Sequence, residues 1–183
     1  MRMMRMAAVA ALMGAFALVG TASASADSTS CNTAGSIKLS PGLTTTPTVQ
    51  NVSVKGSLSE CVSVESEATE GKFLAHFKTA EPISCATLAS GGVGAAAEEN
   101  KIILKLKPKG GGNPQGTFST EVREGSSPLS GTITSEGPFF EDTVGGSITQ
   151  AYTGGATCGV VPEGKKKAKK VNKGTFTGTL SVS

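Results

Sequence analysis

Apolar and polar residues alternate in several stretches of the chain, and this alternation predicts short β-strands. The clearest stretch covers residues 49–58, in which Val52, Val54 and Leu58 share one face and polar side chains share the other. Because successive side chains of a strand point to opposite faces, a period of two indicates one buried face and one solvent-exposed face. Seven further segments are predicted as strands: residues 36–39, 72–78, 101–107, 117–123, 131–135, 144–152 and 175–182.

Glycine and proline separate these segments and predict the turns between them. Ser40-Pro41-Gly42 is expected to end the first strand, and the glycine-rich residues 108–114 are expected to join residues 101–107 and 117–123 into a hairpin. Residues 84–88 fit either one helical turn or an edge segment. Residues 91–97, which are mostly small, are expected to form a loop.

Strands of this kind must bury their apolar faces against one another. About eight short strands joined by Gly and Pro turns therefore predict an all-β fold, namely a two-layer antiparallel β-sandwich of immunoglobulin-like or jelly-roll-like type. A closed β-barrel is the alternative. The 24 glycines agree with many tight turns. The absence of tryptophan agrees with a core of Val, Leu, Ile and a few Phe.

The first 26 residues differ from the rest of the chain and predict a signal peptide. Arg2 and Arg5 precede an uncharged apolar run over residues 7–20, and Ala24-Ser25-Ala26 offers the small residues of a cleavage site. The run is too short to span a bilayer, and no later segment is apolar enough to do so. Residues 1–26 are therefore expected to be cleaved, leaving residues 27–183 as a single secreted β-sandwich domain.

Four cysteines lie in the exported part of the chain, and an even count in such a chain predicts two disulfides rather than metal or catalytic thiols. We favour Cys31 with Cys61 and Cys85 with Cys158, because the first pair would close the ends of an early antiparallel strand pair. The main competing arrangement joins Cys61 to Cys85 and Cys31 to Cys158.

One stretch of the chain resembles known proteins. Residues 31–61 read C-x3-G-x-I-x-L-S-P-G-L-T-x2-P-x2-Q-x-V-x-V-x-G-x-L-S-x-C, a layout similar to that of a group of small secreted actinobacterial proteins of uncharacterised function. The residues that carry the resemblance belong to turns and strand faces: Gly35, Ile37, Leu39, Pro41, Gly42, Leu43, Gln50, Val52, Val54, Gly56 and Leu58. The resemblance implies export and a β-rich fold, and it implies no activity.

Few residues offer catalytic chemistry. His76 is the only histidine and is expected to face solvent from a strand, and the nucleophile motif G-x-S-x-G is absent. A glycosidase would need two converging carboxylates, drawn from Glu60, Glu65, Glu67, Glu70, Glu136, Glu141 and Asp142. These carboxylates have no diagnostic spacing, so we expect a non-catalytic protein. The alternative is a secreted hydrolase that uses these surface carboxylates.

Metal binding, cofactor binding and glycosylation are not predicted. Glu141-Asp142 supplies oxygen atoms that suit Ca²⁺, but the spaced ligands of an EF-hand are missing and a solvated acidic turn is expected. Asn51-Val52-Ser53 matches the N-x-S glycosylation motif, which an exposed asparagine on the outer face of a strand explains equally well.

A run of lysines is the strongest local charge feature, and its members are Lys165, Lys166, Lys167, Lys169 and Lys170. Their mutual repulsion predicts a solvated loop. In an exported protein such a loop would attract an anionic cell-wall polymer or a membrane surface through screened, salt-sensitive contacts. Specific nucleic-acid binding is not predicted, because no aromatic residues are interleaved to stack on bases. The sequence thus predicts an extracellular or envelope-associated binding or structural module.

Overall fold

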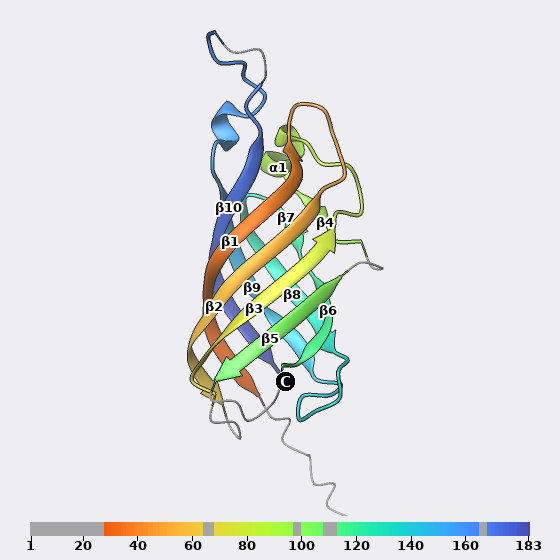
Figure 1. The fold of residues 1–183 in the computed structure, drawn as a ribbon, viewed down its shortest axis with the longest axis vertical. Helices are drawn as coiled ribbons and strands as arrows, with labels where there is room; N and C mark the ends of the chain where they lie inside the picture. The colour runs from red at the N-terminus through yellow and green to blue at the C-terminus, as the bar shows by residue number, and fades with distance from the viewer. Residues whose placement is uncertain (1–27, 64–67, 97–99, 108–112, 165–167) are drawn as a thin grey trace, which may run out of the picture.

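Eight antiparallel strands join edge to edge into a closed barrel in the computed structural model, which describes residues 28–63, 68–96, 100–107, 113–164 and 168–183 (Figure 1). The barrel strands are β1 (Thr29–Leu43), β2 (Asn51–Ser63), β3 (Glu70–Lys78), β5 (Lys101–Lys107), β6 (Gln115–Ser119), β8 (Gly125–Ile133), β9 (Thr143–Tyr152) and β10 (Val171–Val182). Each barrel strand pairs with the next one along the chain, and β10 returns to pair with β1. The predicted signal peptide lies outside the described residues.

The all-β prediction is confirmed, and the closed barrel, expected as the alternative, is the observed arrangement. The two-layer sandwich is not, because β1 and β10 pair along most of their length, from Thr29 opposite Val182 to Lys38 opposite Lys173. This pairing leaves the main sheet without a free edge. A barrel and a sandwich both bury one face of each strand, which is why the alternation of residues did not distinguish them.

The predicted inward faces are confirmed in the barrel. Val52, Val54 and Leu58 of β2 are buried, and so are the apolar residues expected to share a face on the other strands. Those residues are Phe73, Ala75 and Phe77 of β3, Ile102, Leu104 and Leu106 of β5, Phe118 of β6, and Phe176, Leu180 and Val182 of β10. The core therefore fills the inside of the barrel, and most polar residues of the strands lie on its outer wall. Thr29, Thr33, Ser127 and Gln150 are polar strand residues that are buried.

Some predicted boundaries were wrong. The first strand does not end at residues 40–42, because β1 runs through Pro41 to Leu43 with a register shift between Lys38 and Leu43. The strand expected over residues 131–135 is the end of the longer β8, which begins at Gly125. The segment 117–123 is divided between β6 and the short strand β7 (Glu121–Val122).

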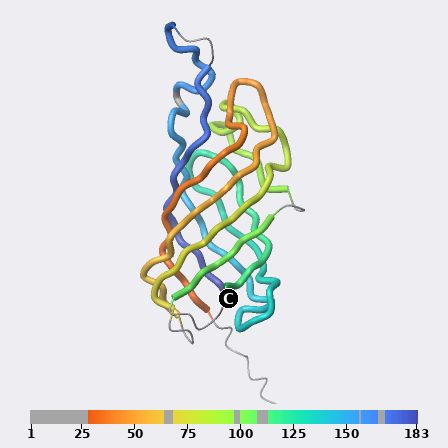
Figure 2. Tube along the Cα trace, in the orientation of Figure 1, coloured from red at the N-terminus to blue at the C-terminus, as the bar shows by residue number. Residues whose placement is uncertain are grey.

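A small cap covers the upper end of the barrel (Figures 1 and 2). It contains α1 (Cys85–Ser90), which confirms a helical turn in this region, and the strand pair formed by β4 (Val93–Gly94) and β7. β4 lies where a loop was expected. Ser84 caps α1 by accepting a hydrogen bond from the Thr87 backbone N–H at 3.3 Å, and Leu88 is buried in the core. A 3-10 turn, η2 (Gly155–Thr157), follows β9.

Two glycines and two phenylalanines form a continuous row inside the barrel. Phe73, Gly56, Gly35 and Phe176 lie directly opposite one another on β3, β2, β1 and β10. The phenyl rings reach over the two glycines and their centroids are 5.5 Å apart. A Cβ atom on Gly56 would lie 2.3 Å from the Phe73 ring. This glycine–phenylalanine row therefore packs two large rings where the backbones carry no side chains.

Two disulfides fasten the ends of these elements. Cys31 at the start of β1 is joined to Cys61 near the end of β2, and Cys85 of α1 is joined to Cys158 after η2. The favoured pairing is thus confirmed and the competing one is wrong. Two disulfides in an all-β domain are compatible with an extracellular location.

Substitution of Gly35 by alanine tests the inner row. The added Cβ would lie 2.1 Å from the Lys55 carbonyl oxygen, so a backbone must move, and we expect the free energy of unfolding to fall by about 1–3 kcal/mol. Gly94→Ala is the control, because a Cβ there meets no atom within 4 Å, and a change within about 0.5 kcal/mol is expected. Denaturant unfolding measures both. Equal effects in the two variants would contradict the steric role of Gly35.

Removal of the disulfides tests their contribution to stability. Cys85→Ala/Cys158→Ala is expected to lower the free energy of unfolding by about 2–5 kcal/mol, because the bond closes a long loop in the unfolded chain. Cys31→Ala/Cys61→Ala should cost about 0.8 kcal/mol less, since its sequence separation is 30 against 73 residues. Denaturant unfolding of both double variants gives the order, and the reverse order would contradict a loop-closure origin.

Candidate functional site

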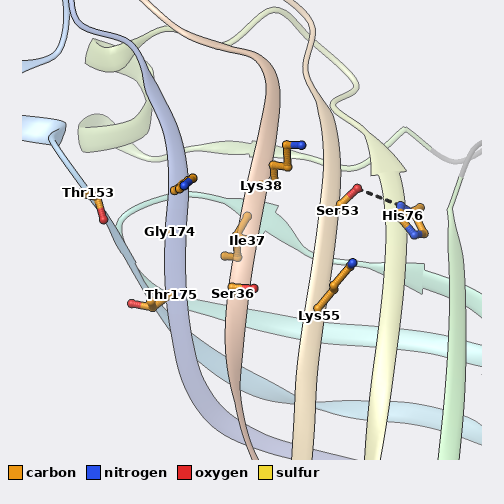
Figure 3. Close-up of a pocket in the computed structure, with 10 residues that line it drawn as sticks. Ser36, Ile37, Lys38, Ser53, Lys55, His76, Thr153, Gly174 and Thr175 are labelled. Carbon is orange, nitrogen blue, oxygen red and sulfur yellow. Dashed lines mark hydrogen bonds between the residues drawn. The ribbon is translucent and has the colours of Figure 1, made fainter.

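A groove of about 630 Å³ crosses the outer wall of the barrel over β10, β1, β2 and β3 (Figure 3). Its cationic side chains are Lys38, Lys55 and Lys173. Hydroxyl groups and one imidazole also line it, from Ser36, Ser53, Thr153, Thr175 and His76. The groove thus combines positive charge with hydrogen-bond donors on adjacent strands.

The strand register places four residues of the groove in line with a fifth residue, Lys101, which does not line the groove. Lys173 is directly opposite Lys38, Lys38 opposite Ser53, Ser53 opposite His76, and His76 opposite Lys101. These five residues come from β10, β1, β2, β3 and β5, and we refer to them as the cross-strand row. The row runs at a right angle to the strands, along the direction of the hydrogen bonds between them.

The core of the barrel determines that the cross-strand row faces outward. Ile37 and Leu39 are buried on either side of Lys38, and Val52 and Val54 are buried on either side of Ser53. Since side chains alternate along a strand, burial of the neighbours turns the residue between them to the outer wall. The same reasoning applies to His76, which lies between buried Ala75 and Phe77.

Lysines are distributed unevenly around the barrel. The strands β6, β8 and β9 contain no charged residue. The strands β10, β1, β2, β3 and β5 are adjacent and carry eight lysines: Lys38, Lys55, Lys72, Lys78, Lys101, Lys105, Lys107 and Lys173. We refer to the outer wall formed by these five strands as the basic wall. Its positive charge contrasts with the three remaining barrel strands, which are uncharged and rich in Ser and Thr.

At two places on the basic wall, a lysine lies directly opposite another lysine on the neighbouring strand. These pairs are Lys38 with Lys173 and Lys72 with Lys105. Like charges in this position are destabilising. In the part of the chain that the structure describes, the ion pairs join Lys107 to Glu70 and Arg123 to Glu121, each at 3.3 Å, and none involves Lys38 or Lys173. The groove therefore holds positive charge that the described carboxylates leave unneutralised.

Ser53 and His76 share a hydrogen bond of 3.0 Å between Oγ and Nδ1 (Figure 3). A serine beside a histidine is the core of a nucleophile–base pair, which also needs a third group to orient the base. Among the described residues, Ser53 is the one side chain that hydrogen-bonds His76, and the residue opposite on β5 is Lys101. The groove thus holds a hydroxyl and an imidazole side by side.

A second polar cluster is buried inside the upper part of the barrel. The Tyr152 hydroxyl donates to Gln150 Oε1 at 2.6 Å, and Gln150 Nε2 donates to the Glu121 carbonyl at 2.7 Å and to Ser127 Oγ at 2.9 Å. Burial raises the pKa of the Tyr152 hydroxyl above its usual value, and the negative charge of Glu124 raises it further. These contacts hold β7 against β8 and β9, which is a structural role.

The predicted lysine run is described only in part. Lys165, Lys166 and Lys167 lie outside the described residues, whereas Lys169 and Lys170 are exposed. Lys169 belongs to a protruding hairpin above the barrel, where its backbone exchanges hydrogen bonds with Val160 and Gly159 (Figure 1). Lys170 immediately precedes β10, the strand that carries Lys173 of the cross-strand row.

The candidate carboxylates that the structure describes lie in three places. Glu60 accepts a hydrogen bond from Asn32, and Glu70 pairs with Lys107. Glu136, Glu141 and Asp142 lie between β8 and β9, and Glu65 and Glu67 are outside the described residues. Within the described ranges, no group of three or more His, Cys, Asp or Glu side chains is placed to hold a metal ion. Asn51 is exposed on the outer wall, as expected.

Sequence reasoning missed the groove although it predicted its parts. The outward position of Lys55, Ser53 and Lys101 follows from alternation, but the alignment of Lys173 with Lys38 depends on the closure of the barrel by β10 and β1. The signal that could have revealed the groove is the concentration of lysines on strands that are adjacent in the barrel. It can be recognised only when the strand order is known.

The fold and site define an up-and-down β-barrel with a basic outer groove. Comparisons of the chain with models of protein families, with curated proteins and with solved structures find no match. Among the described helices, none has the length and apolar character needed to cross a membrane.

Substitution of Lys173 by glutamate tests the repulsion in the groove. The new carboxylate would face Lys38, so we expect the free energy of unfolding to rise by about 0.2–1 kcal/mol at low salt. The gain should shrink at about 1 M salt, where charges on the surface are screened. Lys169→Glu, in the protruding hairpin, changes net charge equally and is the control. Thermal unfolding at both salt concentrations measures the effect, and equal shifts in the two variants would contradict a local repulsion.

Proposed function

We propose that this protein is an extracellular, non-catalytic binding domain that holds an anionic polymer of the cell envelope on its basic wall. The observation that carries the proposal is the concentration of eight lysines on five adjacent strands, beside three strands that carry no charge. Clustered charge of one sign raises the local concentration of oppositely charged ligands and accelerates their association.

The extracellular location is supported by two independent features. The disulfides Cys31–Cys61 and Cys85–Cys158 are of the kind that persists in oxidising compartments. The first 26 residues have the charged, apolar and small-residue regions of a cleavable signal peptide. Together they favour a mature domain that works outside the cytoplasm, where wall polymers are accessible.

A linear polymer fits the basic wall better than a bilayer does. The lysines extend over five of the eight barrel strands and therefore around a large part of a convex surface. A flat membrane contacts a convex cylinder along a narrow strip, whereas a flexible chain can follow its curvature. Lys169 and Lys170 of the protruding hairpin would add attraction at one end of the wall.

A binding role is also favoured over hydrolysis by the groove, because the described residues that line it include no carboxylate. Glu70 is engaged by Lys107, and Glu60 by Asn32. Hydrolysis by paired carboxylates needs two of them on either side of one bond. The groove, by contrast, is lined by lysines, hydroxyls and His76, which supply hydrogen-bond donors to an anion.

Cosedimentation of the mature chain with cell-wall sacculi tests the proposal. Binding is expected to weaken steeply as salt is added, because released counterions and screening oppose each lysine–anion contact. It is expected to be lost when anionic polymers have been extracted from the sacculi with acid. Binding that survives extraction, or no binding at low salt, would overturn the proposal. Stronger binding to anionic liposomes than to sacculi would identify a membrane as the partner instead.

Two variants that remove the same number of positive charges locate the surface that binds the polymer. Replacement of Lys38, Lys55, Lys101 and Lys173 by glutamine is expected to weaken sacculus binding by about tenfold or more. Replacement of Lys165, Lys166, Lys167 and Lys169 by glutamine removes the same charge from the lysine run and is expected to weaken it less. A loss confined to the second variant would show that the run, and not the wall, binds the polymer.

A further inference from the structure

We infer, on the basis of the proposed function, that the groove on β10, β1 and β2 is a discrete site for the phosphate groups of a phosphodiester-linked polymer. Lys38 and Lys173 lie side by side at one end of the cross-strand row, and Lys101 lies at the other. Ser53 and His76 are between them and share a hydrogen bond. The cross-strand row thus offers cationic positions at both ends joined by neutral donors, and all of its residues except Lys101 line the groove.

The side chains that line the groove suit a phosphate group. Lysine acts as a compact point charge with three donors, which suits a tetrahedral phosphate approached from several sides. The one arginine among the described residues, Arg123, pairs with Glu121 away from the groove, so the cations that line the groove are lysines. Ser36, Ser53 and Thr175 add hydroxyl donors to the three ammonium groups of the groove.

The dimensions of the groove favour a polymer segment over a single ion. Its volume of about 630 Å³ lies within the range of about 300–1,000 Å³ that is usual for organic ligands. Four steps between neighbouring strands separate Lys173 from Lys101, which corresponds to about 19 Å along the barrel wall at the usual strand spacing. A chain that lies across the strands would bring successive phosphates to the two ends of the row.

Because Lys38 and Lys173 lie directly opposite each other, binding of an anion between them is expected to be energetically favourable. The two ammonium groups repel each other in the free protein, and within the described residues no ion-paired carboxylate relieves them. A phosphate between them would replace repulsion by attraction. Anion binding should therefore stabilise the folded protein, because a ligand that binds only the folded state raises the free energy of unfolding.

The wall provides a matched control for this site. Lys72 and Lys105 are also directly opposite each other on the outer wall, and both are exposed, but neither lines the groove. The variants Lys38→Gln/Lys173→Gln and Lys72→Gln/Lys105→Gln therefore remove the same charge and the same kind of repulsion. They differ in whether the groove is affected, and in the ion pair of Glu70 with Lys107 that lies two residues along from Lys72 and Lys105.

Calorimetric titration with inorganic tripolyphosphate, and with citrate as a tricarboxylate, tests the inference. Wild type and the Lys72/Lys105 variant are expected to bind tripolyphosphate with affinities within about threefold of each other, while the Lys38/Lys173 variant loses about tenfold or more. Citrate, which carries less negative charge, should bind wild type more weakly than tripolyphosphate. Tripolyphosphate should raise the melting temperature of wild type but not that of the groove variant, whose own melting temperature should equal or exceed that of wild type and so report intact folding.

Each contrary result has a distinct meaning. Equal losses in the two double variants would overturn the discrete site and leave diffuse binding by the basic wall. Equal affinity for citrate and tripolyphosphate would overturn the preference for phosphate. Wild type that binds sacculi but not tripolyphosphate would overturn the groove site while the proposed function stands, whereas wild type that binds neither would overturn both.

Discussion

The packing of Phe73 and Phe176 over Gly35 and Gly56 is the interaction on which the arrangement of the barrel depends. It joins four neighbouring strands at one register, and the two rings meet only when that register is kept. A slip of one residue would move each ring to the outer wall and turn residues such as Lys38 inward. The order of the charged groups outside is therefore enforced by apolar packing inside.

The strands were predictable because their alternation reports local burial, but the way the sheet closes was not. Val52 and Val54 reveal an inward face from their own neighbourhood, whereas the pairing of Thr29 with Val182 joins the two ends of the described chain. Pro41 illustrates another limit. Its rigid ring suggested the end of a strand, yet the backbone continues through it along an irregular stretch between Lys38 and Leu43.

The candidate site shows the same division between local and long-range information. The run from Lys165 to Lys170 is conspicuous in the sequence because its charges are adjacent, and it directed the functional prediction to one loop. The cross-strand row is distributed over five strands and has no local signature. Each of its lysines resembles an ordinary solvated strand residue until the register places it beside another. Electrostatic function in a barrel can thus be encoded in strand order.

The closure of the barrel by its first and last strands also bears on how the chain is connected. Thr29 begins the first barrel strand and Val182 ends the last, and the two residues are neighbours. The first and last barrel strands therefore start and finish side by side, at the opening of the barrel opposite the cap (Figure 1). Every strand is then equivalent in having a partner on both sides, and no strand is distinguished by being first or last. The domain is accordingly a candidate for circular permutation, in which the present ends are linked and new ones are opened at an exposed turn.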